Sequence, residues 1–172
     1  MNVRRFALLL VPLLLLWAAQ AEVNHLLSAR QLFFFAGGLH VAFIALTQPF
    51  GPGLASVLIA GLFCDASHPV AFGTHAALFG LAHNTIFRMR DRIPKDDAVA
   101  ATLLALFTNF GLFLALAAVL SPDGGTPWPR LAGDLACSQV LIAVATPWFF
   151  ALQSRFIDLV EAALALRAGR LR

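Results

Sequence analysis

The sequence has few charged residues and no tyrosine. Only 12% of its 172 residues are charged, whereas 60% are hydrophobic, and soluble domains carry about twice that share of charge. Such a chain is not an ordinary soluble domain. Its apolar runs are continuous and rich in Leu, Ala and Phe, which is not the alternating pattern of a transmembrane β-barrel. We expect an all-α, polytopic membrane protein that forms one integral membrane domain over residues 1–172.

Motifs of catalysis and of metal binding are also missing. The two cysteines, Cys64 and Cys137, lie in apolar segments without CxxC or Cys/His spacing, so neither a disulfide framework nor a zinc site is expected. There is no GxSxG, HExxH or P-loop sequence. His75 and His83 would lie about 12 Å apart along a helix, too far to share an ion. We expect no enzymatic activity, no cofactor and no metal.

Six apolar segments are long enough to be considered as membrane spans. They lie near residues 6–21, 32–47, 53–64, 70–87, 98–120 and 131–152. Turn-forming sequences rich in Pro and Gly separate the second from the third and the fifth from the sixth. The third segment is short, so it predicts either a tilted span or a re-entrant arm. The first also fits a signal peptide ending at Ala21, but an uncleaved span is the favoured interpretation.

The basic residues indicate the orientation of the chain. With a cytoplasmic amino terminus and six spans, ten of the twelve basic residues fall on the inside and only Arg30 and Arg130 fall outside. We therefore expect a multi-pass protein of the bacterial inner membrane with both termini cytoplasmic. The positive charge then reflects topology, and no nucleic acid partner is expected. Residues 153–172 carry apolar residues at near-helical spacing with charged residues between them. This pattern predicts a cytoplasmic amphipathic tail that contacts the lipid bilayer or a partner.

The main cytoplasmic loop carries mixed charge. Its basic residues are Arg88, Arg90, Arg92 and Lys95, and its acids are Asp91, Asp96 and Asp97. Mixed charge of this kind differs from the long basic runs of nucleic-acid binders. The four basic residues form a candidate docking site for a cytoplasmic partner.

One polar motif interrupts the apolar sequence between the third and fourth segments. It contains Gly61, Asp65, Pro69, Gly73 and His75. A carboxylate near hydrocarbon depth costs about 2.5–3.5 kcal/mol, so its presence requires a compensating role. A structural or interface role is favoured, with Asp65 capping the next helix or pairing exposed backbone groups. A ligand-binding carboxylate and a proton relay are the alternatives.

Together with chain length and span count, this motif resembles the rod shape-determining protein MreD family. The resemblance in detail covers residues 53–81. It implies a non-enzymatic membrane scaffold of the bacterial cell-elongation complex, which helps organise peptidoglycan synthesis and cell shape. The partners it implies are an MreC-like periplasmic membrane-anchored protein, the MreB filament and wall-synthesis enzymes. The family has no established catalytic residues, so the five motif positions are expected to be fold or interface positions.

A transport function is the rival hypothesis. A six-helix chain of this size is also similar to the substrate-binding component of an energy-coupling-factor vitamin transporter. The outer loop around residues 65–75 would then cover a small-molecule pocket. Convergent polar and aromatic side chains around a closed cavity would distinguish the two functions, and the sequence offers few of them.

Overall fold

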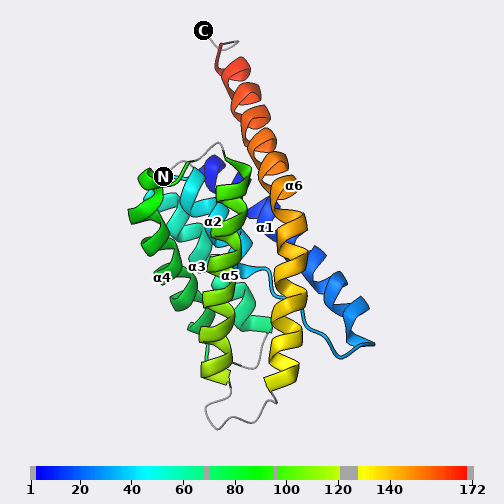
Figure 1. Cartoon of the computed structure of the whole chain (residues 1–172). Coiled ribbons are helices and arrows are strands. Elements are labelled where there is room, and N and C mark those ends of the chain that lie inside the picture. Colours follow the sequence, from blue (N-terminus) through cyan, green and yellow to red (C-terminus); the bar gives the residue numbers. More distant parts are fainter. Residues whose placement is uncertain (1–2, 68–69, 95–96, 121–127, 170–172) are drawn as a thin grey trace.

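The chain is all-α, as the composition predicts. The computed structural model describes residues 3–67, 70–94, 97–120 and 128–169, and over these ranges it contains helices and connecting turns but no strand. The helices are α1 (Val3–Ser28), α2 (Gly37–Thr47), α3 (Phe50–Ser67), α4 (Thr74–Met89), the 3-10 helix η1 (Arg90–Arg92), α5 (Ala98–Leu120) and α6 (Trp128–Gly169). Figure 1 shows them as one bundle from which the end of α6 projects.

Three of the described helices are long and apolar enough to cross a membrane. They are Phe50–Ser67, Ala98–Leu120 and the Trp128–Ile157 part of α6, whereas the apolar α2 has only 11 residues. The third predicted segment is therefore part of an 18-residue helix, about 27 Å long. These lengths support a membrane-embedded helical protein.

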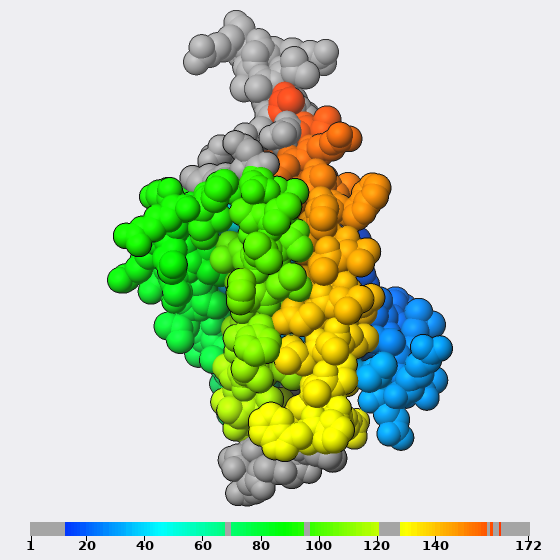
Figure 2. Space-filling view, in the orientation of Figure 1, coloured from blue at the N-terminus to red at the C-terminus, as the bar shows by residue number. Residues whose placement is uncertain are grey.

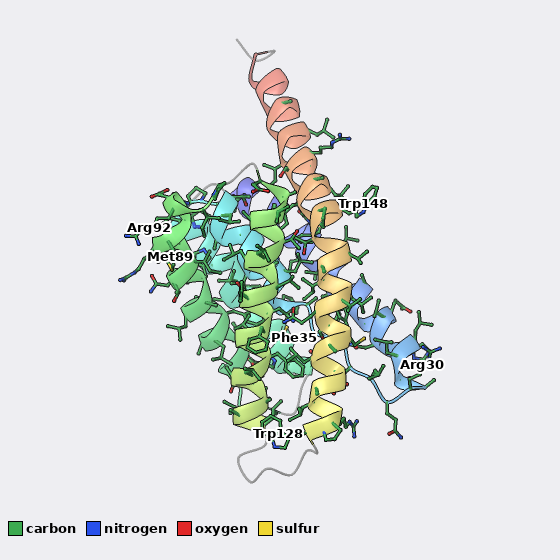
Figure 3. All side chains as sticks on the ribbon, viewed as in Figure 1. Arg30, Phe35, Met89, Arg92, Trp128 and Trp148 are labelled. Atoms are coloured by element: carbon green, nitrogen blue, oxygen red, sulfur yellow. The ribbon has the colours of Figure 1, made fainter. Side chains whose placement is uncertain are left out.

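Two tryptophans on α6 have the spacing of the two membrane boundaries. Trp128 and Trp148 are both 79% exposed, and the 20 positions between them correspond to about 30 Å of helix. This length equals the typical thickness of the hydrocarbon core, and tryptophan concentrates at both of its interfaces. Figure 3 shows the two side chains toward opposite ends of the bundle. Both tryptophans belong to the Trp128–Ile157 part of α6, which is long and apolar enough to cross a membrane.

The core of the bundle surrounds α2. Every residue from Gly37 to Leu46 is buried, as expected of a helix that is apolar on all sides. Phe43 contacts Phe149 and Phe150 of α6 edge to face, with ring centroids 5.6 and 5.1 Å apart. The backbones of α2 and α5 are in direct contact, since a Cβ at Gly38 would lie only 2.3 Å from Asn109 Cα.

A non-helical and largely buried segment, residues 33–36, precedes α2, and we call it the extended segment. Each of its backbone N–H groups donates to a side-chain oxygen: Phe33 to Asp134 Oδ1 (2.8 Å), Phe34 to Asn24 Oδ1 (2.6 Å), Phe35 to Ser138 Oγ (3.0 Å) and Ala36 to Gln20 Oε1 (3.0 Å). Just inside α2, Gly38 N–H donates to Asn109 Oδ1 at 3.1 Å. Non-helical backbone at membrane depth is tolerated only where protein groups replace water in this way.

Three predicted segments therefore need correction. The segment 32–47 is not one helix, because its first residues bond to side chains of α1 and α6 rather than to the next helical turn. The segment 70–87 becomes helical only at Thr74, because Gly73 adopts a left-handed conformation with φ +100°. The sixth helix is longer than 131–152. It runs to Gly169 without interruption, with Pro147 inside it.

The two chain ends lie at the same end of the bundle as η1 (Figure 1). Arg92 is at this end, whereas Arg30 and Trp128 lie toward the opposite end (Figure 3). The even number of crossings that the basic residues predict stays a prediction, because the structure contains no membrane. Which end faces the cytoplasm is part of the proposal below.

We predict that Ser138→Ala destabilises the fold by about 1–3 kcal/mol, because it leaves the buried Phe35 N–H without an acceptor. This cost exceeds the roughly 0.6 kcal/mol average for a hydrogen bond between membrane helices. Val140→Ala, at a position 64% exposed on the same helix, is the control. Thermal unfolding in detergent measures both, and equal stability of the two variants would contradict the assigned role of Ser138.

Candidate functional site

The polar motif is assembled where α3 packs against α4. Gly61 on α3 faces Ala76 on α4, and a Cβ at Gly61 would lie 2.3 Å from Ala76 Cα and 2.4 Å from Ala76 N. No side chain fits at such distances, so glycine is required for the two backbones to touch. Close approach through small residues is a common basis of helix packing in membranes.

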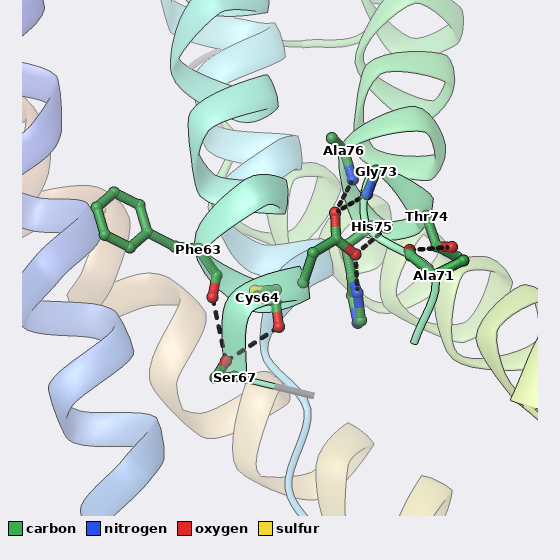
Figure 4. Close-up of polar contacts among 9 residues, drawn as sticks. Phe63, Cys64, Ser67, Ala71, Gly73, Thr74, His75 and Ala76 are labelled. Carbon is green, nitrogen blue, oxygen red and sulfur yellow. Dashed lines mark hydrogen bonds and ion pairs between the residues drawn. The ribbon is translucent and has the colours of Figure 1, made fainter. Parts of the chain in front are cut away.

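Asp65 places its carboxylate at the amino terminus of α4. Oδ1 accepts the backbone N–H of His75 at 2.8 Å, and Oδ2 accepts those of Gly73 at 2.9 Å and Ala76 at 3.4 Å. The first N–H groups of a helix have no partner within the helix, and a negative charge is favoured there. Asp65 is only 4% exposed, so these bonds replace the water that a buried carboxylate loses (Figure 4).

His75 connects this carboxylate to the core. Its Nδ1 lies 2.8 Å from Asp65 Oδ1, and an ionised carboxylate can only accept, so Nδ1 carries the proton. The ring is 2% exposed and packs near Phe35 and Phe79, at centroid distances of 6.4 and 6.0 Å. Because Phe35 belongs to the extended segment, His75 joins the α3–α4 contact to that segment.

Gly73 gives the chain the turn that brings these donors to Asp65. Its φ of +100° and ψ of −8° are rarely adopted by residues with a side chain. Beside it, Thr74 Oγ1 donates to Ala71 O at 2.7 Å. We call Gly61, Asp65, Gly73 and His75 the α3–α4 clamp. Pro69, the fifth residue of the predicted motif, lies outside the described residues.

The clamp joins α3 to α4 through backbone contact and hydrogen bonds. The bonds that Asp65 accepts come from α4 and the turn before it. Within the described ranges, no group of three or more His, Cys, Asp or Glu side chains could hold a metal ion. What this arrangement can do is fix the angle and depth at which α4 lies against α3.

The predicted docking residues lie at the other end of α4. Arg90 points inward, donating from Nη1 to Gln48 O at 3.0 Å and lying 3.9 Å from the centroid of the Phe87 ring. Arg88 Nε donates to Asn84 Oδ1 at 3.3 Å. Arg88 and Arg92 are exposed. Lys95 lies outside the part of the chain that the structure describes. The clamp and the basic residues are therefore separate sites.

Sequence reasoning missed two anchors of the extended segment, Gln20 and Asn24. They are four positions apart on α1, so they lie on one face of that helix, and both bond to residues 33–36. Amides at this spacing on an apolar helix are the signal that could have revealed them.

No protein-family model matches the chain, and neither a curated protein nor a solved structure is significantly similar to it. Its function is therefore inferred from the residues and their geometry.

We predict that Gly61→Ala strongly destabilises the protein, by several kcal/mol, because the added methyl group meets backbone rather than a movable side chain. Gly111→Ala on α5 is the matched control. Its Cβ would meet nothing within 4 Å, and replacing a helical glycine then stabilises by about 0.4–1 kcal/mol. Opposite effects on the thermal unfolding midpoint are the expected result. Similar shifts for both variants would show that the α3–α4 contact is looser than described.

Proposed function

We propose that this protein is a non-enzymatic membrane scaffold of the bacterial cell-elongation complex, which helps organise peptidoglycan synthesis. The observation that carries the proposal is the geometry of the α3–α4 clamp. The clamp consists of the described residues of the MreD-like motif, and it fixes α4 against α3. A fixed arrangement of helices is expected of a scaffold protein.

The internal polar groups support the same role. Side-chain oxygens of Asn24, Asn109, Asp134 and Ser138 accept backbone N–H groups in and next to the extended segment. Groups engaged in this way stabilise one arrangement of helices. They are poorly suited to binding and releasing a substrate, because each release would leave a buried N–H group unpaired.

The outer faces of α5 and α6 are suited to contacts within the membrane. They expose large apolar side chains, among them Leu103, Phe107, Phe110, Val140, Val144 and Leu152. In a membrane-embedded protein such faces contact lipid or the helices of other membrane proteins. We propose that an MreC-like protein and the wall-synthesis enzymes bind here.

At the end of the bundle near η1, the exposed Arg88 and Arg92 are the proposed contacts for cytoplasmic partners such as an MreB filament. This places η1 and both termini in the cytoplasm, in agreement with the excess of basic residues on that side. The inner membrane is the corresponding location.

The cavity lined by α1 to α4 does not supply the ligand pocket that the transport function requires, and the larger space of about 390 Å³ is an open groove between α4 and α5. The volume of the cavity is about 30 Å³, and Leu13, Trp17, Gln20, His40 and Phe79 are among its lining residues. Pockets for small organic ligands have volumes of about 300–1,000 Å³. The cavity is large enough for water but not for a vitamin.

Variants of Asp65 test the proposal in a rod-shaped host that lacks its own copy of the gene. Asp65→Ala and Gly73→Leu should impair assembly of the elongation complex and widen the cells, because α4 loses its cap or its turn. Asp65→Asn keeps one acceptor oxygen and should have a weaker effect. Leu26→Ala, at an exposed position of α1 outside the proposed contact faces, should restore normal width.

The same cells allow a pull-down in mild detergent, followed by mass spectrometry of proteins and small molecules. Recovery of MreC-like and wall-synthesis proteins is the expected result, and it should decrease in the Asp65→Ala variant. Recovery of paired ATPases or of a stoichiometric vitamin would instead establish transport. Normal cell width in both Asp65→Ala and Gly73→Leu cells would remove the functional importance assigned to the clamp.

A further inference from the structure

A groove runs between α4 and α5, which lie side by side on the face of the molecule drawn in Figure 2. Its volume is about 390 Å³. Leu81, Ala82 and Met89 line it on α4, and Phe107, Gly111 and Ala115 line it on α5. Both helices lie within the membrane-embedded bundle, so an apolar molecule must fill this space.

The groove is open at a glycine of α5 and is bordered by large exposed side chains. A Cβ on Gly111 would meet nothing within 4 Å, so the floor is open at that point. Leu81 and Phe107, which form part of the walls, are 65% and 73% exposed. A flexible apolar chain can lie on this floor between the two side chains.

The length of the groove corresponds to one leaflet. Its lining residues extend from Leu78 to Met89 on α4 and from Leu104 to Ala115 on α5, which is about 16 Å of helix in each case. The hydrocarbon core of a bilayer is about 30 Å thick. A partner helix would cross both leaflets, whereas a lipid acyl chain fills one. The groove therefore fits an acyl chain better than a helix.

Positive charge lies at the interfacial end of the groove. Its lining ends at Met89 and Ile93, and the exposed Arg88 and Arg92 neighbour these residues in the chain. Figure 3 shows Met89 and Arg92 next to each other at the edge of the bundle. The one acid between them, Asp91, lies 3.9 Å from Arg90, so residues 88–92 keep a net charge of +2.

We propose that the α4–α5 groove binds an acyl chain of an anionic phospholipid, whose phosphate is held by Arg88 and Arg92. Guanidinium groups pair with phosphate oxygens through two parallel hydrogen bonds, and basic residues next to a membrane span attract anionic head groups. The lipid belongs to the leaflet on the η1 side. The site shares Arg88 and Arg92 with the proposed cytoplasmic contact. Its lipid preference is measured without partner proteins, so it can fail independently of the scaffold function.

The test uses the full chain reconstituted in phosphatidylcholine vesicles that contain a trace of photoactivatable lipid. The probe is phosphatidylglycerol or phosphatidylcholine with a diazirine in its acyl chain, and mass spectrometry maps the labelled residues. Groove residues should be labelled about thirtyfold more by the phosphatidylglycerol probe, as two arginines near the surface would give. The double variant Arg88→Gln/Arg92→Gln should lose this preference. Arg30→Gln, which removes an exposed basic residue toward the opposite end of the bundle, should retain it.

A second variant, Gly111→Leu, fills the groove and should lower its labelling by both probes while leaving the α6 face unchanged. If this variant does not fold, the labelling of the Arg88→Gln/Arg92→Gln variant decides the test. Equal labelling by the two lipids, or a preference that survives the arginine substitutions, would overturn the proposal. So would a co-purified transmembrane protein that cross-links in the groove and prevents lipid labelling.

Discussion

A backbone N–H group that is buried away from water must find an acceptor, and this requirement organises the interior of the protein. Residues 33–36 leave the helical conformation, so their N–H groups depend on oxygens supplied by Gln20, Asn24, Asp134 and Ser138. Two of these acceptors lie on α1 and two on α6. The extended segment therefore joins the first helix to the last and positions α2 between the other helices. Loss of one acceptor therefore removes a hydrogen bond and also weakens the connection between α1, α2 and α6.

The α3–α4 clamp meets the same requirement at a helix terminus. Asp65 accepts the N–H groups that α4 cannot pair within itself, and His75 carries the connection on to Phe35. Both polar sites thus meet at the extended segment. A structure that uses its few polar side chains in this way has a firmly held interior and an apolar exterior. This division of roles is what the proposed scaffold function requires.

The sequence predicted the fold class because composition and apolar length determine it. It also predicted both ends of α5, where turn-forming sequences flank a uniform apolar run. The extended segment could not be predicted in this way, because Phe33, Phe34 and Phe35 are as apolar as any helical residues around them. Two of its acceptors, Asp134 and Ser138, lie 101 and 103 positions from the N–H groups that they accept. Capping of the next helix by Asp65 could be predicted, because the carboxylate and the helix terminus are only about ten residues apart. The contact of Gly61 with Ala76 could not, because it depends on how α3 and α4 cross.

The length of α6 has a mechanical consequence. Of its 42 residues, those beyond Ser154 extend about 22 Å further as one helix, as the projecting end in Figure 1 shows. Pro147 lies directly before Trp148, and a proline within a helix removes one backbone hydrogen bond and favours a bend. The projecting part is continuous with the part of α6 that holds the extended segment, and Phe149 and Phe150 pack its base against Phe43. A force on its far end would be transmitted through α6 to Ser138 and Asp134, and so to the extended segment at the centre of the bundle.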